Sequence, residues 1–150
     1  MKKQLIATVL FSAALHAQAG VDRFVQKITL PAELTAVVAE GDFEARSIGS
    51  FTVRLYSTEN AQPGDDTTFF VDGIIRERDG SIEKVELADI DGDGEPELIV
   101  TVRNAGTGQY LSAHAVGFDK NRVWLQAAVA DLAQDADPIA ALKKAKLNRK

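Results

Sequence analysis

The chain has 150 residues, of which 17 are Lys or Arg, 22 are Asp or Glu and none is Cys. With 45% hydrophobic and 26% charged residues, it predicts one globular domain and excludes disulfides, thiol nucleophiles and cysteine-ligated metals. The net charge of −5, without a stripe of basic residues, argues against nucleic acid and anionic membranes as partners, since both bind basic surfaces.

The first 19 residues predict a cleaved secretory signal peptide. Lys2 and Lys3 form a basic start, Leu5–Leu15 is apolar but too short to span a bilayer, and Ala17-Gln18-Ala19 places small residues at a cleavage site. Cleavage after Ala19 leaves one domain, residues 20–150, with 15 basic and 22 acidic residues and hence a net charge of −7. We therefore expect export to a bacterial periplasm, without insertion into the membrane.

The rest of the chain alternates apolar and polar residues with the period of two that is typical of β-strands. Phe51, Val53 and Leu55, for example, alternate with polar neighbours and form one apolar face. In chain order, the predicted strands are Gln26–Leu30, Thr35–Glu40, Phe51–Tyr56, Phe69–Arg76, Ile82–Leu87, Glu97–Arg103, Gln109–Phe118 and Arg122–Ala127. Short strands at this spacing favour a mainly β fold, an antiparallel β-sandwich or closed barrel of about eight strands.

Turn residues and a short C-terminal helix complete the predicted fold. Asp79-Gly80 predicts a tight hairpin turn because glycine tolerates positive φ, and Asp119-Lys120-Asn121 predicts a second reversal. Consecutive hairpins imply antiparallel pairing of neighbouring strands. Asp137 and Pro138 have the character of an N-cap and a first-turn residue, and Ile139–Lys144 suits a helix with basic residues near its negative end.

An acidic segment between two predicted strands is a candidate calcium site. Asp89, Asp91 and Asp93 alternate around glycines and match the first half of a calcium-binding loop. The second half departs from the pattern, because Val100 stands where a bidentate acid is expected and only Glu97 offers a substitute. Two interpretations remain open: a structural Ca²⁺ site formed by these four acids, or a solvated acidic turn.

The segment Arg103–Tyr110 is the candidate binding loop. It lies between two apolar strands, and Gly106 and Gly108 allow an unusual backbone path. An ordinary hairpin is one interpretation. In the other, the loop projects, with Thr107 and Tyr110 presenting hydroxyls and the tyrosine acting as an interface anchor.

We expect the protein not to be an enzyme. After signal removal His114 is the only histidine, it is predicted to share a strand face with Ser112 and Val116, and no G-x-S-x-G motif occurs. The many acids leave a paired-carboxylate hydrolase open, but no pair is singled out. Trp124 is interpreted as a packing residue rather than as a sugar-binding platform.

Several segments together resemble the periplasmic inhibitors of invertebrate-type (I-type) lysozyme. The resemblance covers essentially all of the mature chain. Its segments are Val38–Ser50, Val53–Tyr56, Asp79–Gly94 and Tyr110–Ala113. It implies an exported β protein that inserts a loop into the lysozyme active-site cleft and so protects peptidoglycan. Family members can be homodimeric, and the resemblance implies no required cofactor.

The resemblance also implies which residues bind lysozyme. The family's Ser-Gly-x-Tyr loop falls on Thr107, Gly108, Gln109 and Tyr110, where threonine keeps the hydroxyl of serine and adds a methyl group. The neighbouring residues of interest are Arg103, Asn104 and Gly106. The alternative function is a small periplasmic calcium- or glycan-binding β module without inhibitory activity.

Overall fold

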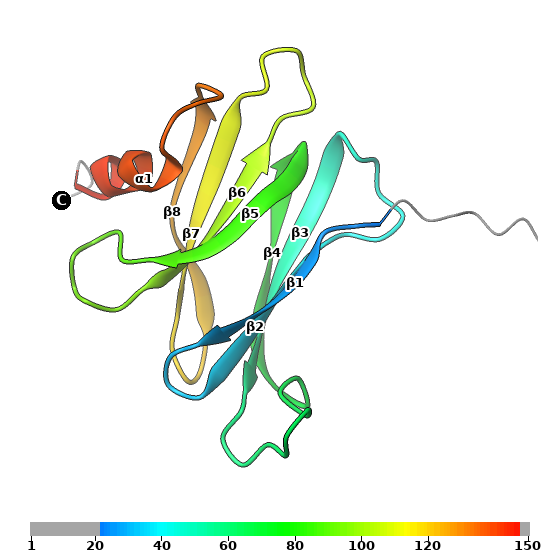
Figure 1. Cartoon of the computed structure of the whole chain (residues 1–150), viewed down its shortest axis with the longest axis vertical. Helices are drawn as coiled ribbons and strands as arrows, with labels where there is room; N and C mark the ends of the chain where they lie inside the picture. The colour runs from blue at the N-terminus through cyan, green and yellow to red at the C-terminus, as the bar shows by residue number, and fades with distance from the viewer. Residues whose placement is uncertain (1–21, 148–150) are drawn as a thin grey trace, which may run out of the picture.

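The computed structural model describes residues 22–147, which form eight β-strands and one helix (Figure 1). The strands are β1 Val25–Leu30, β2 Leu34–Glu40, β3 Ile48–Ser57, β4 Phe69–Asp79, β5 Ser81–Ala88, β6 Glu97–Arg103, β7 Leu111–Phe118 and β8 Val123–Leu132. Each predicted strand is present, which confirms the mainly β class. The predicted signal peptide, residues 1–19, lies outside the described residues.

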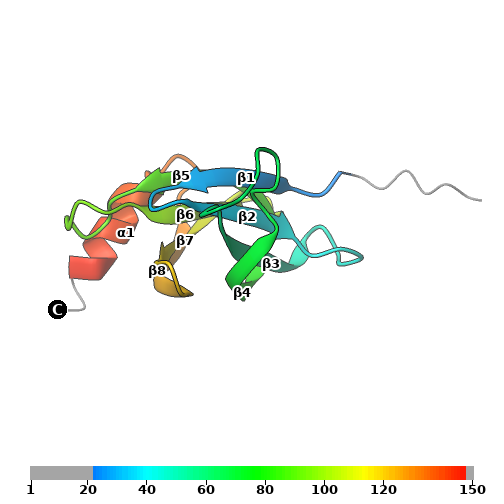
Figure 2. The same ribbon diagram turned by 90° about the horizontal axis from the view of Figure 1, so that it is seen from below.

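The strands form two antiparallel four-stranded sheets, each in chain order: β1-β2-β3-β4 and β5-β6-β7-β8. Strands β1 and β5 run along one side of the molecule, whereas β4 and β8 splay apart on the other (Figure 2). In the described part of the chain no backbone pairing joins the two sheets. The fold is therefore an open sandwich, and the closed-barrel alternative is wrong.

The passage from one sheet to the other occurs at Gly80. We predicted a hairpin turn at Asp79-Gly80, but β4 and β5 belong to different sheets and do not pair. The expected positive φ is present at 116°, yet a Cβ on Gly80 would lie 1.9 Å from the Arg103 carbonyl oxygen. The end of β6 therefore occupies the space that a side chain at position 80 would need, so the crossover in this form requires glycine there.

The main hydrophobic core lies between the inner faces of the two sheets. Alternation along each strand places one set of aliphatic side chains inward, where they exclude water from the sandwich. Fourteen buried residues make up this core: Leu30, Leu34, Ala36, Val38, Phe51, Val53, Leu55, Ile82, Val85, Leu98, Val100, Val102, Val116 and Val123.

Two carboxylates connect the sheets by accepting backbone hydrogen bonds across the sandwich. Glu40 on β2 accepts from the Ile82 N–H of β5 at 2.7 Å, and Asp72 on β4 accepts from the Val123 N–H of β8 at 2.9 Å. The backbone hydrogen bond from Val123 holds the pKa of Asp72 below its ordinary value. These bonds give a hydrogen-bond partner to backbone N–H groups near the starts of β5 and β8.

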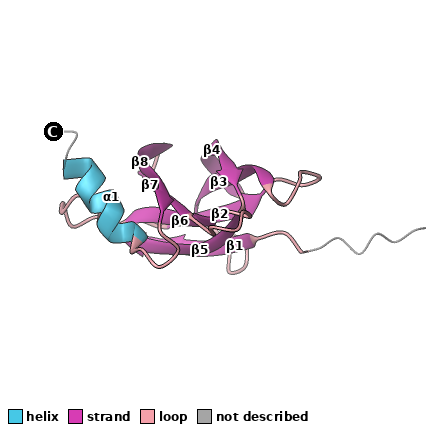
Figure 3. Ribbon diagram, turned by 90° about the horizontal axis from the view of Figure 1, so that it is seen from above, coloured by secondary structure: helices cyan, strands magenta, loops and turns pink. Residues whose placement is uncertain are grey.

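Helix α1 (Pro138–Leu147) covers the outer face of the second sheet (Figure 3). The Asp137 carboxylate caps it by accepting from the N–H groups of Ile139 and Ala140 at 2.9 and 3.2 Å, which confirms the predicted N-cap. Leu142 is fully buried in a second cluster with Ile90, Ile99, Ala113, Ala115 and Ala127. Among residues 22–147 no helix is long and apolar enough to cross a membrane.

Candidate functional site

The segment Asn104–Tyr110 is the loop between β6 and β7, and a backbone hydrogen bond joins its two ends. The Asn104 N–H donates to the Tyr110 carbonyl at 2.9 Å, and the Gln109 N–H donates to the Gly106 carbonyl at 3.1 Å. We predicted that the following strand begins at Gln109, but β7 begins at Leu111, so Tyr110 lies in the loop. Thr107 and its neighbours as far as Tyr110 are exposed, and the Tyr110 residue is 52% exposed.

Arg103 supports the loop from the end of β6. Its guanidinium forms a salt bridge with the Glu83 carboxylate of β5, with Nη2 and Oε1 2.8 Å apart, and Nη1 donates to the Gln109 carbonyl at 3.1 Å. The hydrogen bond from Arg103 lowers the pKa of Glu83 and keeps this acid ionised. Arg103 therefore holds the loop backbone in place, and its guanidinium N–H groups donate to other residues of the same chain.

Asn104 connects the loop to the crossover between the sheets. Its side-chain amide donates to the Asp79 carboxylate at 2.7 Å, and its Oδ1 accepts from the Gly106 N–H at 2.5 Å. Sequence reasoning missed Asp79 as part of this site, because it explained the residue fully as a turn former. The amide and carboxylate are separated by 25 positions, and no local pattern indicates such a pair.

The glycine at position 108 allows the Tyr110 ring to fold back on the loop. A Cβ on Gly108 would lie 2.4 Å from the Tyr110 Cε2 and 3.0 Å from its Cζ, closer than atoms pack. Gln109, between them, has a φ of 45°, which turns the chain sharply. The order glycine, turn residue, tyrosine thus sets where the aromatic ring lies.

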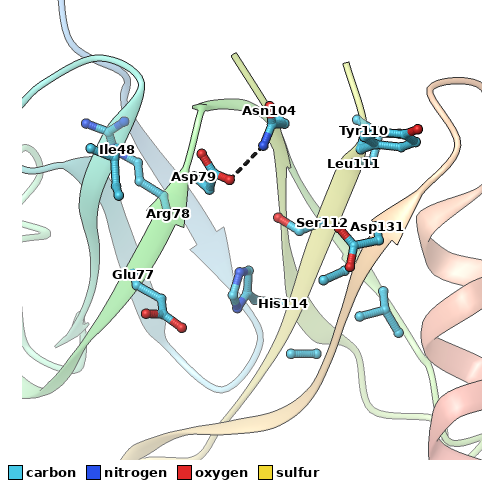
Figure 4. A pocket seen from close by; sticks show the side chains of 13 residues that line it. Ile48, Glu77, Arg78, Asp79, Asn104, Tyr110, Leu111, Ser112, His114 and Asp131 are labelled. Atoms are coloured by element: carbon cyan, nitrogen blue, oxygen red, sulfur yellow. Dashed lines mark hydrogen bonds between the residues drawn. The ribbon is translucent and has the colours of Figure 1, made fainter. Parts of the chain in front are cut away.

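A cleft of about 420 Å³ opens beside this loop, between the ends of the two sheets (Figure 4). Strands β4 and β8 meet at the hydrogen bond between Asp72 and Val123, then diverge toward Asp79 and Asp131, which line the cleft. Ile48 of β3 and Tyr110 lie on opposite sides of it. The cleft has a mostly apolar floor with acidic groups at its rim.

His114 lies on the floor of the cleft and faces the first sheet. Its ring packs edge-on against Phe51, with the centroids 5.1 Å apart, and its buried Nδ1 has no hydrogen-bond partner. Burial lowers the pKa of His114, and the nearby positive charge of Arg76 lowers it further, while Glu77 opposes them. The ring is therefore neutral at pH 7 and packs as an aromatic group.

Three acids of the predicted calcium site come together, and the fourth does not. One oxygen each of Asp89, Asp91 and Glu97 lies within 4.8 Å of the others, whereas Asp93 is outside this group. Asp89 accepts backbone hydrogen bonds from Gly92 and Gly94 at 2.7 and 3.0 Å, which lower its pKa. Asp89 thereby fixes the backbone of the turn that contains Gly92 and Gly94.

Glu97 is the buried member of this cluster. It accepts from the Ile90 N–H at 2.9 Å and from the Gln126 amide at 2.6 Å, and Gln126 also donates to Asp91 at 2.9 Å. Burial raises the pKa of Glu97, and the charges of the neighbouring aspartates raise it further. The Lys146 ammonium lies 3.3 Å from Asp91 and offsets part of the negative charge.

Trp124 packs within the second sheet. Its ring lies against Gly117 of β7, where a Cβ would come within 2.5 Å of it, and the Arg122 guanidinium lies 4.8 Å from the ring centroid. With both Gly117 and Arg122 against the ring, the indole is placed as a packing group, as the sequence interpretation has it.

The loop, the cleft and the acidic turn all lie within a region that matches a known protein family. A family model described as periplasmic lysozyme inhibitor of I-type lysozyme, PliI, matches residues 22–146. The chain belongs to the PliI family. This membership confirms the resemblance noted in the sequence, and it makes the protein a periplasmic inhibitor of I-type lysozyme, not an enzyme.

Two solved structures are similar to the chain. One is the periplasmic lysozyme inhibitor PliI-Ah from Aeromonas hydrophila, with 42% identity, a TM-score of 0.74, and 79% of this chain and 98% of that chain covered. The other is the A. hydrophila PliI in complex with Meretrix lusoria lysozyme, with 43% identity, a TM-score of 0.73, and 80% and 95% covered. Among curated proteins, none matches the chain.

Proposed function

We propose that this PliI-family protein inhibits I-type lysozyme by inserting the loop Thr107–Tyr110 into the substrate cleft of the enzyme. The observation that carries the proposal is that this loop is exposed at its tip and fixed by hydrogen bonds. Arg103 donates to the Gln109 carbonyl, and the Asn104 side chain donates to Asp79. A loop that is already in shape loses little conformational entropy on binding, which favours affinity. Blocking the cleft makes inhibition competitive with peptidoglycan.

The chemistry of the tip suits a lysozyme cleft. Lysozymes cleave glycosidic bonds with two carboxyl groups placed across a sugar-binding groove. The hydroxyls of Thr107 and Tyr110 can donate hydrogen bonds to such carboxyls, and the tyrosine ring fills space that a sugar would occupy. The loop thus presents donors where the enzyme presents acceptors.

The test is inhibition of cell-wall lysis by M. lusoria lysozyme with variants at Tyr110. Tyr110→Ala should weaken inhibition by about 2 kcal/mol, or about thirtyfold, because it removes an aromatic anchor. Tyr110→Phe should lose only the part due to the hydroxyl. Tyr56→Phe is the matched control, since Tyr56 is the other tyrosine of the chain and its ring packs against Phe70.

The outcome that rejects the loop assignment is unchanged inhibition by Tyr110→Ala at full thermal stability. Absence of any inhibition by the unmodified protein would instead favour the binding-module alternative, in which isolated glycans or calcium bind without lysozyme. Measurements with chicken- and goose-type lysozymes in parallel separate I-type specificity from general lysozyme binding.

Export by a cleaved signal peptide is part of the proposal. The basic, apolar and small-residue segments before Gly20 have the order that a signal peptidase requires. The protein isolated from the periplasm should therefore begin at Gly20, which N-terminal sequencing or intact mass measures directly. A product that begins at Met1 contradicts this.

Calcium binding at the acidic turn stays a proposal, supported by the convergence of Asp89, Asp91 and Glu97. A bound divalent cation would offset the electrostatic repulsion among these three carboxylates. Isothermal titration of chelator-treated protein should then show calcium binding that Glu97→Gln weakens. No heat of binding at millimolar calcium would leave the solvated acidic turn as the explanation.

Homodimer formation likewise stays a prediction. The two sheets leave β1, β4, β5 and β8 as edge strands, and β4 carries the exposed apolar residues Phe69 and Ile75. Exposed sheet edges with apolar residues are typical contact surfaces between copies. Sedimentation velocity on the free protein decides between monomer and dimer.

A further inference from the structure

The loop between β2, which ends at Glu40, and β3, which begins at Ile48, exposes a second aromatic residue. Phe43 is fully exposed, at 105% of its reference area, and has a φ of 62°, which non-glycine residues rarely adopt. Ile48, at the start of β3, is 64% exposed. Exposed apolar side chains of this size need an explanation, because no residue among 22–147 covers them.

The backbone around Phe43 is held by its neighbour Glu44. The Glu44 carboxylate folds inward and accepts from the Ser50 N–H at 2.6 Å and the Ser50 hydroxyl at 2.7 Å. It lies so close to Gly41 and Gly49 that a Cβ at either position would come within 2.4 Å of it. The loop is therefore fixed with the acid inside and the phenyl ring in solvent.

Arg78 adds a second support from β4. Its fully buried guanidinium donates to the carbonyls of Ala45, Arg46 and Ser50 at 2.9 to 3.0 Å and lies 3.7 Å from the Glu44 carboxylate. These internal bonds restrict the loop in the free protein. The loop would therefore lose little conformational entropy on binding a partner.

The two loops form one continuous surface. The Gly80 N–H donates to the Ser47 carbonyl at 2.8 Å, and the adjacent Asp79 carboxylate accepts from Asn104 at 2.7 Å, so both loops attach to the same crossover. Ile48 and Tyr110 line opposite sides of the cleft (Figure 4). A partner protein that binds over Tyr110 is therefore expected to contact Ile48 as well.

We propose that Phe43 and Ile48 form a second anchor for lysozyme, which binds apolar surface beside the substrate cleft that the Thr107–Tyr110 loop enters. This inference rests on the proposed function, because the same enzyme is the occupant. It assigns specificity to the β2–β3 loop: the first loop blocks the cleft common to lysozymes, and the second selects an enzyme with an apolar rim next to it.

The test measures the dissociation constant for M. lusoria lysozyme with variants at each loop. Phe43→Asn removes the apolar ring while suiting the positive φ, so thermal stability should be equal or higher. We expect Phe43→Asn to lower the affinity about tenfold, mainly through faster dissociation. Ile48→Thr should lower the affinity too, but by less. Phe43→Leu should keep most of the affinity, since it keeps apolar area.

Phe69→Thr is the matched control. Phe69 is also a large exposed apolar residue, at 50%, but it lies at the other end of β4 from Asp79. Its replacement should leave lysozyme binding within about twofold of the unmodified protein. Tyr110→Ala is measured alongside, so that failure of the proposed function is seen separately.

Equal affinity of Phe43→Asn and Phe69→Thr, with Tyr110→Ala impaired, overturns the second anchor and leaves the inhibitory loop standing. Unchanged affinity of Phe43→Asn together with a lower sedimentation coefficient also overturns it, because the occupant is then a second copy of the chain. If Tyr110→Ala binds lysozyme with unchanged affinity, the proposed role of the Thr107–Tyr110 loop is rejected, whatever the result for Phe43→Asn.

Discussion

At the scale of single residues, the shape of the Thr107–Tyr110 tip, which is proposed to bind lysozyme, depends on the absence of a side chain at position 108. Tyr110 can lie where it does only because Gly108 leaves room for its ring. The free chain therefore orders an exposed aromatic residue without burying it. This is the property that an interface anchor needs before it meets its partner.

Gly108→Ala should weaken lysozyme inhibition without unfolding the protein. The new Cβ would lie 2.4 Å from the tyrosine ring, which must swing away, while the backbone at 108 keeps a conformation open to alanine. We expect about tenfold weaker inhibition and a change in unfolding free energy below about 0.5 kcal/mol. An inhibition constant equal to that of the unmodified protein would show that the ring position is unimportant.

His114 should make the fold sensitive to mild acid. Burial lowers its pKa in the folded state, so the unfolded chain takes up a proton more readily and stability falls as pH drops through about 6.5. In His114→Phe, which keeps the aromatic packing on Phe51, the free energy of unfolding should vary less between about pH 7.5 and 5.5. Denaturant titrations at several pH values compare the two slopes, and equal slopes contradict the assignment to this histidine.

At the scale of elements, the two loops proposed to bind lysozyme are held by polar side chains rather than by hydrophobic contact, and of these side chains Arg78 is buried whereas Arg103 and Asn104 are partly exposed. Arg78 supports the β2–β3 loop, and Arg103 with Asn104 supports the loop before β7. Each support is a side chain at or beyond the end of a strand that bonds to backbone carbonyls or to an acid in a neighbouring element. Loss of Arg78 would leave its carbonyl partners in the β2–β3 loop without a donor.

Arg78→Met should destabilise the protein strongly. The substitution leaves the carbonyls of Ala45, Arg46, Ser50 and Gly80 without their donor, and we expect a loss of about 3 kcal/mol in unfolding free energy. Arg54→Met is the control, because Arg54 is exposed on β3, and it should cost less than about 0.5 kcal/mol. Similar losses in the two variants would contradict the role given to Arg78.

The strands were predictable because their signal is local. Alternation of apolar and polar residues along β3, and the short apolar run of β6, identify strands whatever they pair with. The choice between a hairpin and a crossover at Gly80 is not local, because it depends on which strands pair in the two sheets. The tip residues of the binding loop were likewise named from sequence, whereas the partners Asp79 and Glu83 come from elements that only the fold brings near.

At the scale of the whole molecule, charge is the property most relevant to finding the partner. The chain carries −5 overall and −7 if the signal peptide is cleaved, and the rim of the cleft carries Glu77, Asp79 and Asp131. A negative field around the binding surface attracts a cationic enzyme over distances of a Debye length.

The association rate with a basic lysozyme should therefore fall as salt is added. Between about 0.05 and 0.5 M NaCl we expect a decrease of about tenfold, with a much smaller change in the dissociation rate. Stopped-flow or surface-binding kinetics measure both rates. A salt-independent association rate would show that the net charge plays no part in the encounter.

The strictly sequential order of strands has a consequence for how the chain acquires its shape. Every hydrogen-bonded strand pair joins neighbours in sequence, and Gly80 divides the chain into two meanders. Each meander can form from contacts between strands that are neighbours in sequence, so we expect the docking of the two sheets to be the slower step of folding. Because both loops proposed to bind lysozyme attach to the residues around Gly80, we expect the proposed binding surface to be completed only when this docking occurs.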